Sequence, residues 1–170
     1  MSVDLLNQLA CEFRSALEIV VNEKQYGRLK IFGSFPNECC RYTSDLLAEY
    51  LVNNDIARKR IQMVESETLE EEYTHCWLMI DSTLFVDITA DQFNKSPYFR
   101  KYAPIPACCV VPLDTYLYEC FDGRKTQYTR NIGIDSYSGE VAAKLQAVYE
   151  AVMRQIKTNR KGEQRYGFLH

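Results

Sequence analysis

The chain has 170 residues, of which 46% are hydrophobic and 25% charged, a composition typical of one globular domain spanning 1–170. Its net charge of −3 provides no basic face, so we expect no nucleic-acid partner. No apolar run approaches the about 18 residues of a membrane span, and the N-terminus lacks a signal-peptide pattern, so we expect no membrane partner.

Seven cysteines are present, an odd number that includes the adjacent pairs Cys39-Cys40 and Cys108-Cys109. There is no CxxC spacing and no second histidine near a cysteine pair, so the sequence predicts neither a metal site nor a cofactor. Free thiols favour a reducing compartment. We therefore expect a cytoplasmic protein, or a secreted effector that acts in a reducing cytosol.

Two helices are expected in the first third of the chain. Residues 4–21 repeat apolar side chains every three or four positions, which predicts an amphipathic helix capped by Ser2 or Asp4. A loop with glycine and proline follows, and a second helix is expected over about 38–53, with Asn37 as its N-cap.

The middle of the chain predicts strands. Residues 61–64 form a short strand by composition, and the acidic stretch 65–72 is expected to be a solvated loop. Residues 74–80 and 84–89 have the pattern of a β-hairpin around a three-residue turn.

The last part of the chain combines irregular segments, strands and one long helix. Residues 98–106 are expected to be irregular because of their prolines, and 108–111 to be a buried strand. Residues 113–121 and 125–132 are expected to form two further strands that pair. Residues 139–157 have the apolar spacing of an amphipathic helix, and the whole pattern predicts one α+β domain.

The candidate nucleophile is one of two adjacent cysteines, Cys39 and Cys40, at the start of the second helix. A helix N-terminus lowers the pKa of a thiol through its unpaired amides and its dipole, which favours the reactive thiolate. Successive helical residues point about 100° apart, so only one of the two can face a shared site. Both could instead be small core residues, or form a readily reduced vicinal disulfide that switches the site off.

The candidate base is His75, since the only other histidine is the last residue, His170. Because the hairpin turn has three residues, Asp87 is expected on the same face, opposite Trp77 and one diagonal step from His75. A carboxylate there can hold the imidazole in one tautomer and stabilise its imidazolium. Asp91 is the alternative carboxylate, and a hydrogen-bonded core histidine is the alternative interpretation of His75.

These residues resemble the transglutaminase-like branch of the papain-like cysteine hydrolases. In that family a cysteine opens a helix, a histidine-x-tryptophan strand follows, and a later strand ends in valine-aspartate-x-threonine. Cys40, residues 75–77 and residues 86–89 match this pattern over roughly a third to a half of the chain. The family also has a small residue four positions after the nucleophile, which is Ser44 if Cys40 attacks.

The resemblance implies a papain-like/transglutaminase-like core, in which the helix carrying the cysteine packs on an antiparallel sheet carrying histidine and aspartate. Cys40 would attack a carbonyl, His75 would transfer the proton and Asp87 would orient His75. The chain departs from the family in having Arg41 after the nucleophile and Cys39 before it, and no glutamine at the upstream oxyanion position.

The remaining roles have several candidates. The oxyanion would be bound by the backbone N–H of Cys40 together with Ser34 or Asn37. Trp77 and Gln92 are candidates for contacts on the substrate side.

The sequence thus predicts a thiol-dependent hydrolase or acyltransferase that acts on an amide of a protein or peptide. Water as second nucleophile gives a protease or a glutamine deamidase, and an amine gives a transamidase. The alternative is a catalytically inactive interaction module that keeps the same fold. The sequence defines neither the substrate nor the oligomeric state.

Overall fold

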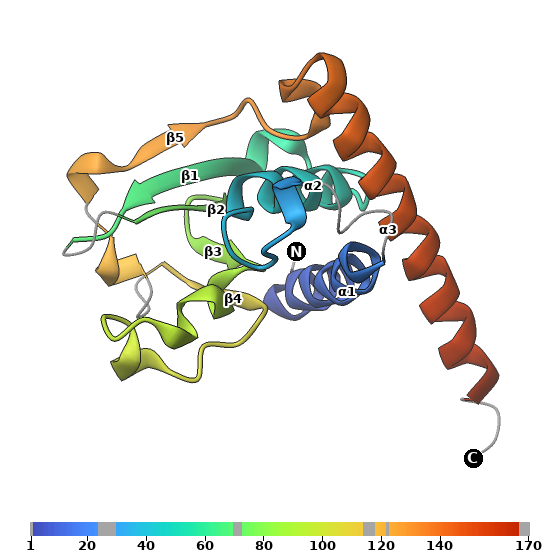
Figure 1. Ribbon diagram of the computed structural model, residues 1–170, viewed down its shortest axis with the longest axis horizontal. Coiled ribbons are helices and arrows are strands. Elements are labelled where there is room, and N and C mark those ends of the chain that lie inside the picture. The colour runs from blue at the N-terminus through green and yellow to red at the C-terminus, as the bar shows by residue number, and fades with distance from the viewer. Residues whose placement is uncertain (1, 24–29, 70–72, 114–117, 122, 167–170) are drawn as a thin grey trace.

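The computed structural model describes residues 2–23, 30–69, 73–113, 118–121 and 123–166. Within them the chain is mixed α+β, as expected, with a five-stranded antiparallel sheet in the order β4-β3-β2-β1-β5. The strands are β1 Ile61–Glu67, β2 Thr74–Ile80, β3 Leu84–Asp87, β4 Cys109–Pro112 and β5 Gln127–Thr129. The α-helices of the described residues lie on one side of the sheet (Figure 1): α1 Val3–Asn22, α2 Cys40–Val52 and α3 Gly139–Tyr166.

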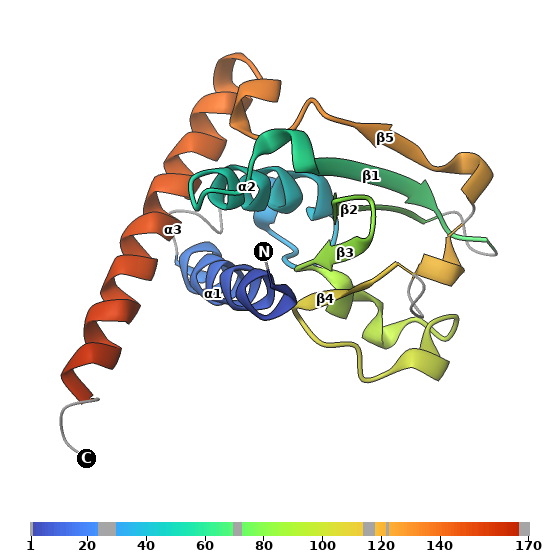
Figure 2. The same cartoon turned by 180° about the vertical axis from the view of Figure 1, so that it is seen from behind.

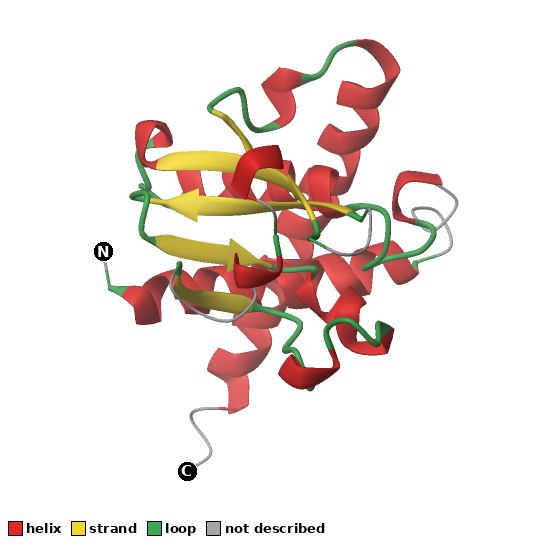
Figure 3. Ribbon diagram, turned by 90° about the vertical axis from the view of Figure 1, so that its left-hand side faces the viewer, coloured by secondary structure: helices red, strands yellow, loops and turns green. Residues whose placement is uncertain are grey.

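The sheet separates two apolar cores, with helices behind it in Figure 3. Side chains alternate along β2, so Cys76, Leu78 and Ile80 face the helices, whereas Trp77 and Met79 face the opposite side. On that opposite side, short 3-10 turns after β3 cover a second cluster, which contains Trp77, Phe85, Phe93, Phe99 and Phe121. α2 therefore approaches the sheet from one side, and the aromatic cluster supports it from the other.

The three predicted helices are present with different ends. Ser2 caps α1 by accepting a hydrogen bond from the Leu5 N–H at 3.2 Å, as expected. The prediction for α2 was wrong at its start, because the N-cap is Cys39, whereas the Asn37 side-chain amide donates to the Ser34 carbonyl at 3.1 Å. Asn37 therefore closes a turn in the loop before the helix.

α3 continues well beyond the predicted end at residue 157 and projects past the rest of the molecule (Figure 2). The apolar repeat that defined the prediction stops at Ile156. Beyond it, polar contacts support the helix: the Arg160 guanidinium binds both carboxylate oxygens of Glu12 on α1, at 2.6 and 2.7 Å. The apolar periodicity of the sequence cannot predict a helical segment that is held by such polar contacts.

The hairpin has the predicted three-residue turn. Ile80 pairs with Leu84 and Leu78 with Val86, so paired numbers sum to an even value. Asp81 and Ser82 in the turn both have positive φ, 53° and 57°, a conformation that Asp and Asn adopt more readily than most residues. Continued past Leu78, this register puts Asp87 on the face of the hairpin that carries His75.

Several strand boundaries differ from the expectation. β1 extends to Glu67, so the expected loop at 65–72 begins later, and residues 70–72 lie outside the described part. The predicted strand at 113–121 was wrong in the part that is described, because Tyr118–Cys120 is a 3-10 turn. The following strand is short, Gln127–Thr129, and pairs with the open edge of β1 instead.

None of the described helices has both the length and the apolar content needed to cross a membrane.

Candidate active site

The N-terminus of α2 brings Cys40, and not Cys39, to a cavity. Cys40 is the first helical residue, where backbone N–H groups have no acceptor within the helix. It is half-buried and lines a cavity of about 340 Å³. Cys39 is only 1% exposed, and its thiol donates to the Pro36 carbonyl oxygen at 3.4 Å. The sequence alternative Cys39 is therefore a structural residue of the loop.

His75 and Asp87 form the hydrogen bond that the hairpin register predicts. The Nε2 atom of His75 lies 2.6 Å from Oδ2 of Asp87, and both side chains are 1% exposed. The other carboxylate oxygen of Asp87 accepts from the Thr89 backbone N–H at 2.7 Å and from its hydroxyl at 2.9 Å. Asp87 is thus fixed on one side by Thr89 and holds the imidazole on the other.

Aromatic rings surround the His75 imidazole on the side of the second core. Phe93 meets it edge-on with ring centroids 4.9 Å apart, Phe121 stacks at 5.9 Å, and Trp77 lies 5.9 Å away. These rings exclude water, and charges interact more strongly in such an environment than in solvent. The bond between His75 and Asp87 is therefore made in a dry site.

The Cys40 thiol and the His75 imidazole are near enough for each to shift the pKa of the other. A hydrogen bond from the Cys76 thiol and the His75 imidazole lower the pKa of Cys40 to about 4 against the effect of burial. Burial lowers the pKa of His75, but the charge and hydrogen bond of Asp87, with Cys40, outweigh it and raise that pKa to about 10. The opposite directions of the two shifts favour a thiolate and an imidazolium at neutral pH.

The neighbouring thiol behaves in the opposite way. Burial, followed by the charge of Cys40, raises the pKa of Cys39 to about 12. Two adjacent residues of the same type are thus separated by their surroundings, and only Cys40 has the electrostatics of a nucleophile.

Cys76 is a third thiol at this site, which the sequence did not single out. Both its side chain and its backbone N–H lie close enough to Cys40 to lower the pKa of the Cys40 thiol. Its own thiol also lies 3.4 Å from a carboxylate oxygen of Glu65, and the pKa of Cys76 is raised by Cys40, by burial and by Glu65. The raised pKa keeps Cys76 protonated, and its one S–H, donated to Glu65 in the structure, has the Cys40 thiolate as an alternative acceptor.

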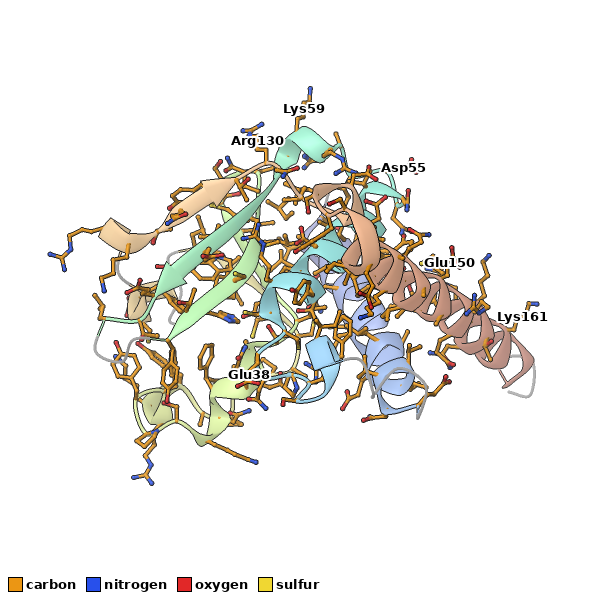
Figure 4. All side chains as sticks on the ribbon, turned by 45° about the horizontal axis from the view of Figure 1, so that its top comes forward. Glu38, Asp55, Lys59, Arg130, Glu150 and Lys161 are labelled. Atoms are coloured by element: carbon orange, nitrogen blue, oxygen red, sulfur yellow. The ribbon has the colours of Figure 1, made fainter. Side chains whose placement is uncertain are left out.

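The cavity beside Cys40 is lined by polar and aromatic side chains from the loop before α2, the start of β2 and the turn after β3. Its described lining consists of Asn37, Glu38, Cys40, Tyr73, Thr74, Gln92, Phe93 and Ser96. Glu38 has a φ of 60°, in the left-handed region, two residues before Cys40. In Figure 4, Glu38 lies where this loop faces the segment that follows β3.

Gln92 connects the cavity to the imidazole. Its Nε2 atom lies 3.2 Å from Nδ1 of His75 and donates to the Thr89 carbonyl oxygen at 2.9 Å. The prediction that Gln92 faces the substrate side agrees with its place in the lining.

A comparison with known proteins finds no matching family model, no similar curated protein and no similar solved structure. The chemistry of the site therefore has to be inferred from its residues.

Among the described residues, no group of three or more His, Cys, Asp or Glu side chains could hold a metal ion. The seven cysteines are all free thiols.

Asp91, the alternative carboxylate, is placed elsewhere. Its two oxygens accept from the Arg14 guanidinium of α1 at 3.0 and 3.1 Å. Arg14 also donates to the Ile88 carbonyl oxygen at 2.6 Å, and its guanidinium lies 4.4 Å from the centre of the Phe35 ring. Asp91 therefore pairs with a buried arginine, whereas Asp87 forms the hydrogen bond with His75.

Two other sequence expectations are corrected. Trp77 is fully buried in the second core and cannot contact a substrate in the cavity. Ser34 is not part of the described lining, and its carbonyl oxygen accepts from both the backbone and the side-chain amide of Asn37. Asn37 does line the cavity, as a candidate oxyanion donor should.

Arg14, which binds the alternative carboxylate Asp91, is a second residue near the site that sequence patterns did not reveal. It lies 77 positions from Asp91 along the chain and at a helix position that reads as polar surface. Little in the sequence indicated that Cys76 belongs to the site: it directly follows His75, but strand alternation places it on the opposite face. Its thiol comes near Cys40 only because α2 approaches the start of β2.

Proposed function

We propose that the protein is a cysteine-nucleophile hydrolase or acyltransferase that acts on an amide of a protein or peptide. The observation that carries this proposal is the buried chain of contacts from Asp87 through His75 to Cys40 at a helix N-terminus, next to a cavity. This order of groups supports a papain-like/transglutaminase-like core, in which thiolate and imidazolium are formed before substrate binds.

In the proposed reaction, the Cys40 thiolate attacks the carbonyl carbon, and the C=O electron pair moves to oxygen as a C–S bond forms. The C–N bond then breaks, and the Nδ1 proton of His75 passes to the leaving nitrogen, which departs as an amine or ammonia. Neutral His75 next removes a proton from water or an amine, which attacks the thioester and releases the Cys40 thiolate. Asp87 stabilises the imidazolium throughout.

The cavity beside Cys40 is the route by which a substrate would reach the thiol. The described side chains that line it include Glu38 as a carboxylate and no lysine or arginine. A neutral or basic segment of a peptide is therefore the favoured occupant beside Cys40, since an acidic one would be repelled.

The test is acylation with p-nitrophenyl acetate, followed by mass spectrometry of the intact protein and of its peptides. We expect one acetyl group on Cys40 and release of p-nitrophenol, both lost in Cys40→Ala and kept in the matched variant Cys39→Ala. Acetylation spread over several cysteines, or unchanged in Cys40→Ala, would contradict the proposal and favour a catalytically inactive interaction module.

The second nucleophile is identified separately. Wild-type protein and Cys40→Ala are compared in a cell lysate for three products that require Cys40. New peptide termini indicate a protease, deamidated glutamines a deamidase, and new isopeptide crosslinks a transamidase.

A further inference from the structure

Gln92 occupies a position at which its side-chain amide meets both the base and the cavity. The Nε2 atom donates to the Thr89 carbonyl oxygen, which can only accept, so this contact fixes which end of the amide is the nitrogen. The second N–H is then directed at His75 Nδ1, 3.2 Å away. The same side chain lines the cavity with Cys40.

The contact between Gln92 and His75 fits only one protonation state of the imidazole. In the neutral form, Nε2 carries the hydrogen bonded to Asp87, and Nδ1 accepts from Gln92. In the ion pair, Nδ1 carries a proton that is donated to the Cys40 thiolate, and it can no longer accept. One amide N–H of Gln92 then has no acceptor on His75.

We propose that Gln92 is a catalytic residue, whose amide N–H binds the substrate oxyanion together with the backbone N–H of Cys40. This inference rests on the proposed function. In the thiolate–imidazolium pair this N–H has no acceptor on Nδ1, so it is available to the carbonyl oxygen of a substrate that binds next. The Thr89 carbonyl holds the amide in place meanwhile, so the donor is oriented before the negative charge develops.

The assignment also answers a question left by the sequence, which has no glutamine upstream of the nucleophile. Here the glutamine comes from the turn Ala90–Lys95 that follows β3, three positions after Thr89 in the same segment that carries Asp87. One short stretch of chain thus supplies both the group that orients the base and the group that binds the oxyanion.

Two reactions of the same thiol test this role. Iodoacetamide alkylates Cys40 by displacement at a saturated carbon, which forms no oxyanion, whereas p-nitrophenyl acetate acylates it through a tetrahedral oxyanion. Gln92→Met keeps the side-chain length without the donor, and Gln92→Ala is the second variant. In both we expect acylation to fall about 100-fold or more, the usual loss of one oxyanion donor, with alkylation within about threefold of wild type.

Asn37→Ala tests the other amide in the described lining of the same cavity. The matched control is Asn54→Ala, which removes an amide that donates to the Tyr50 carbonyl and is not part of that described lining. We expect both reactions to be close to wild type in Asn54→Ala. The inference is overturned if Asn37→Ala, and not Gln92→Met, loses acylation alone. It is also overturned if both reactions fall together in the Gln92 variants, because Gln92 would then only position His75.

The outcomes separate the two proposals. If wild-type Cys40 is neither acylated nor, at about pH 5, alkylated faster than a free thiol, the proposed function fails, and the inference fails with it. If wild-type Cys40 reacts in both assays and the two Gln92 variants react equally well, only the role of Gln92 is refuted. Thermal unfolding of each variant, expected within about 3 °C of wild type, establishes that the fold is kept.

Discussion

Replacing His75 with glutamine should raise the pH at which the Cys40 thiolate forms. Glutamine keeps an amide N–H for the buried Asp87 carboxylate, so the variant removes the imidazolium and leaves Asp87 with a donor. The pKa of Cys40 is then expected to rise from about 4 toward the 9.0 of an ordinary thiol, with only the donors of Cys76 still opposing burial.

Two opposing factors determine how much faster Cys40 is alkylated than a free thiol. At about pH 5, a thiol with a pKa of about 4 is roughly 90% thiolate, whereas one with a pKa of 9.0 is thiolate in about one molecule in ten thousand. A thiolate of lower pKa is also a weaker nucleophile, by about 100- to 300-fold over this difference. The net advantage of wild-type Cys40 over a free thiol at about pH 5 is therefore about 30- to 90-fold, and it disappears near neutrality.

The assay is the rate of Cys40 alkylation by iodoacetamide between about pH 3 and 10, read by peptide mass spectrometry, with N-acetylcysteine as the free thiol. Wild type should reach its plateau above a midpoint near 4, while His75→Gln should keep rising toward alkaline pH. Cys39 is an internal control that should stay unlabelled, since burial raises its pKa to about 12. A midpoint near 4 in both proteins would refute the assignment of His75 as the partner of Cys40.

Three further substitutions test the supporting contacts. Asp87→Asn removes the charge that raises the pKa of His75, and acylation of Cys40 by p-nitrophenyl acetate should fall about 10³- to 10⁴-fold. Cys76→Ala removes a donor to the Cys40 thiolate, so the midpoint of the alkylation profile should move upward, and an unchanged midpoint would exclude this bond. Arg14→Met leaves Asp91 unpaired and should lower the free energy of unfolding by about 3 kcal/mol, seen as a fall in Tm of about 6–12 °C by circular dichroism. A stability equal to wild type would mean that Asp91 is satisfied by solvent.

The pairing of His75 with Asp87 could be predicted because the sequence features that determine it are local. Strand alternation and a three-residue turn are properties of neighbouring residues, and together they fix which face of the hairpin carries Asp87. The choice between Asp87 and Asp91 was not local. It was decided by Arg14, on the first helix, which binds Asp91 across 77 positions of sequence.

The cysteine half was harder to predict for a similar reason. Two identical residues stand at the helix start, and the sequence cannot show which one the loop buries. The structure distinguishes them through one contact, from the Cys39 thiol to the Pro36 carbonyl, and through the helix beginning at Cys40 rather than earlier. The strand prediction was wrong over Tyr118–Cys120, which form a 3-10 turn, because apolar residues such as the neighbouring Phe121 suit an aromatic core as well as a strand.

The place where β3 stops explains the position of Cys40 beside β2. β2 pairs with β1 as far as Thr74, but its recorded pairing with β3 ends at Leu78. The start of β2 therefore has no β3 partner, and α2 approaches it there. The Ser44 hydroxyl donates to the Cys76 carbonyl at 3.4 Å, and the Cys76 N–H lies near enough to Cys40 to lower the pKa of its thiol. Ser44 is small enough for this approach, one helical turn after Cys40. The unequal lengths of two strand pairings thus create a backbone donor for the thiolate, independent of the His75 side chain.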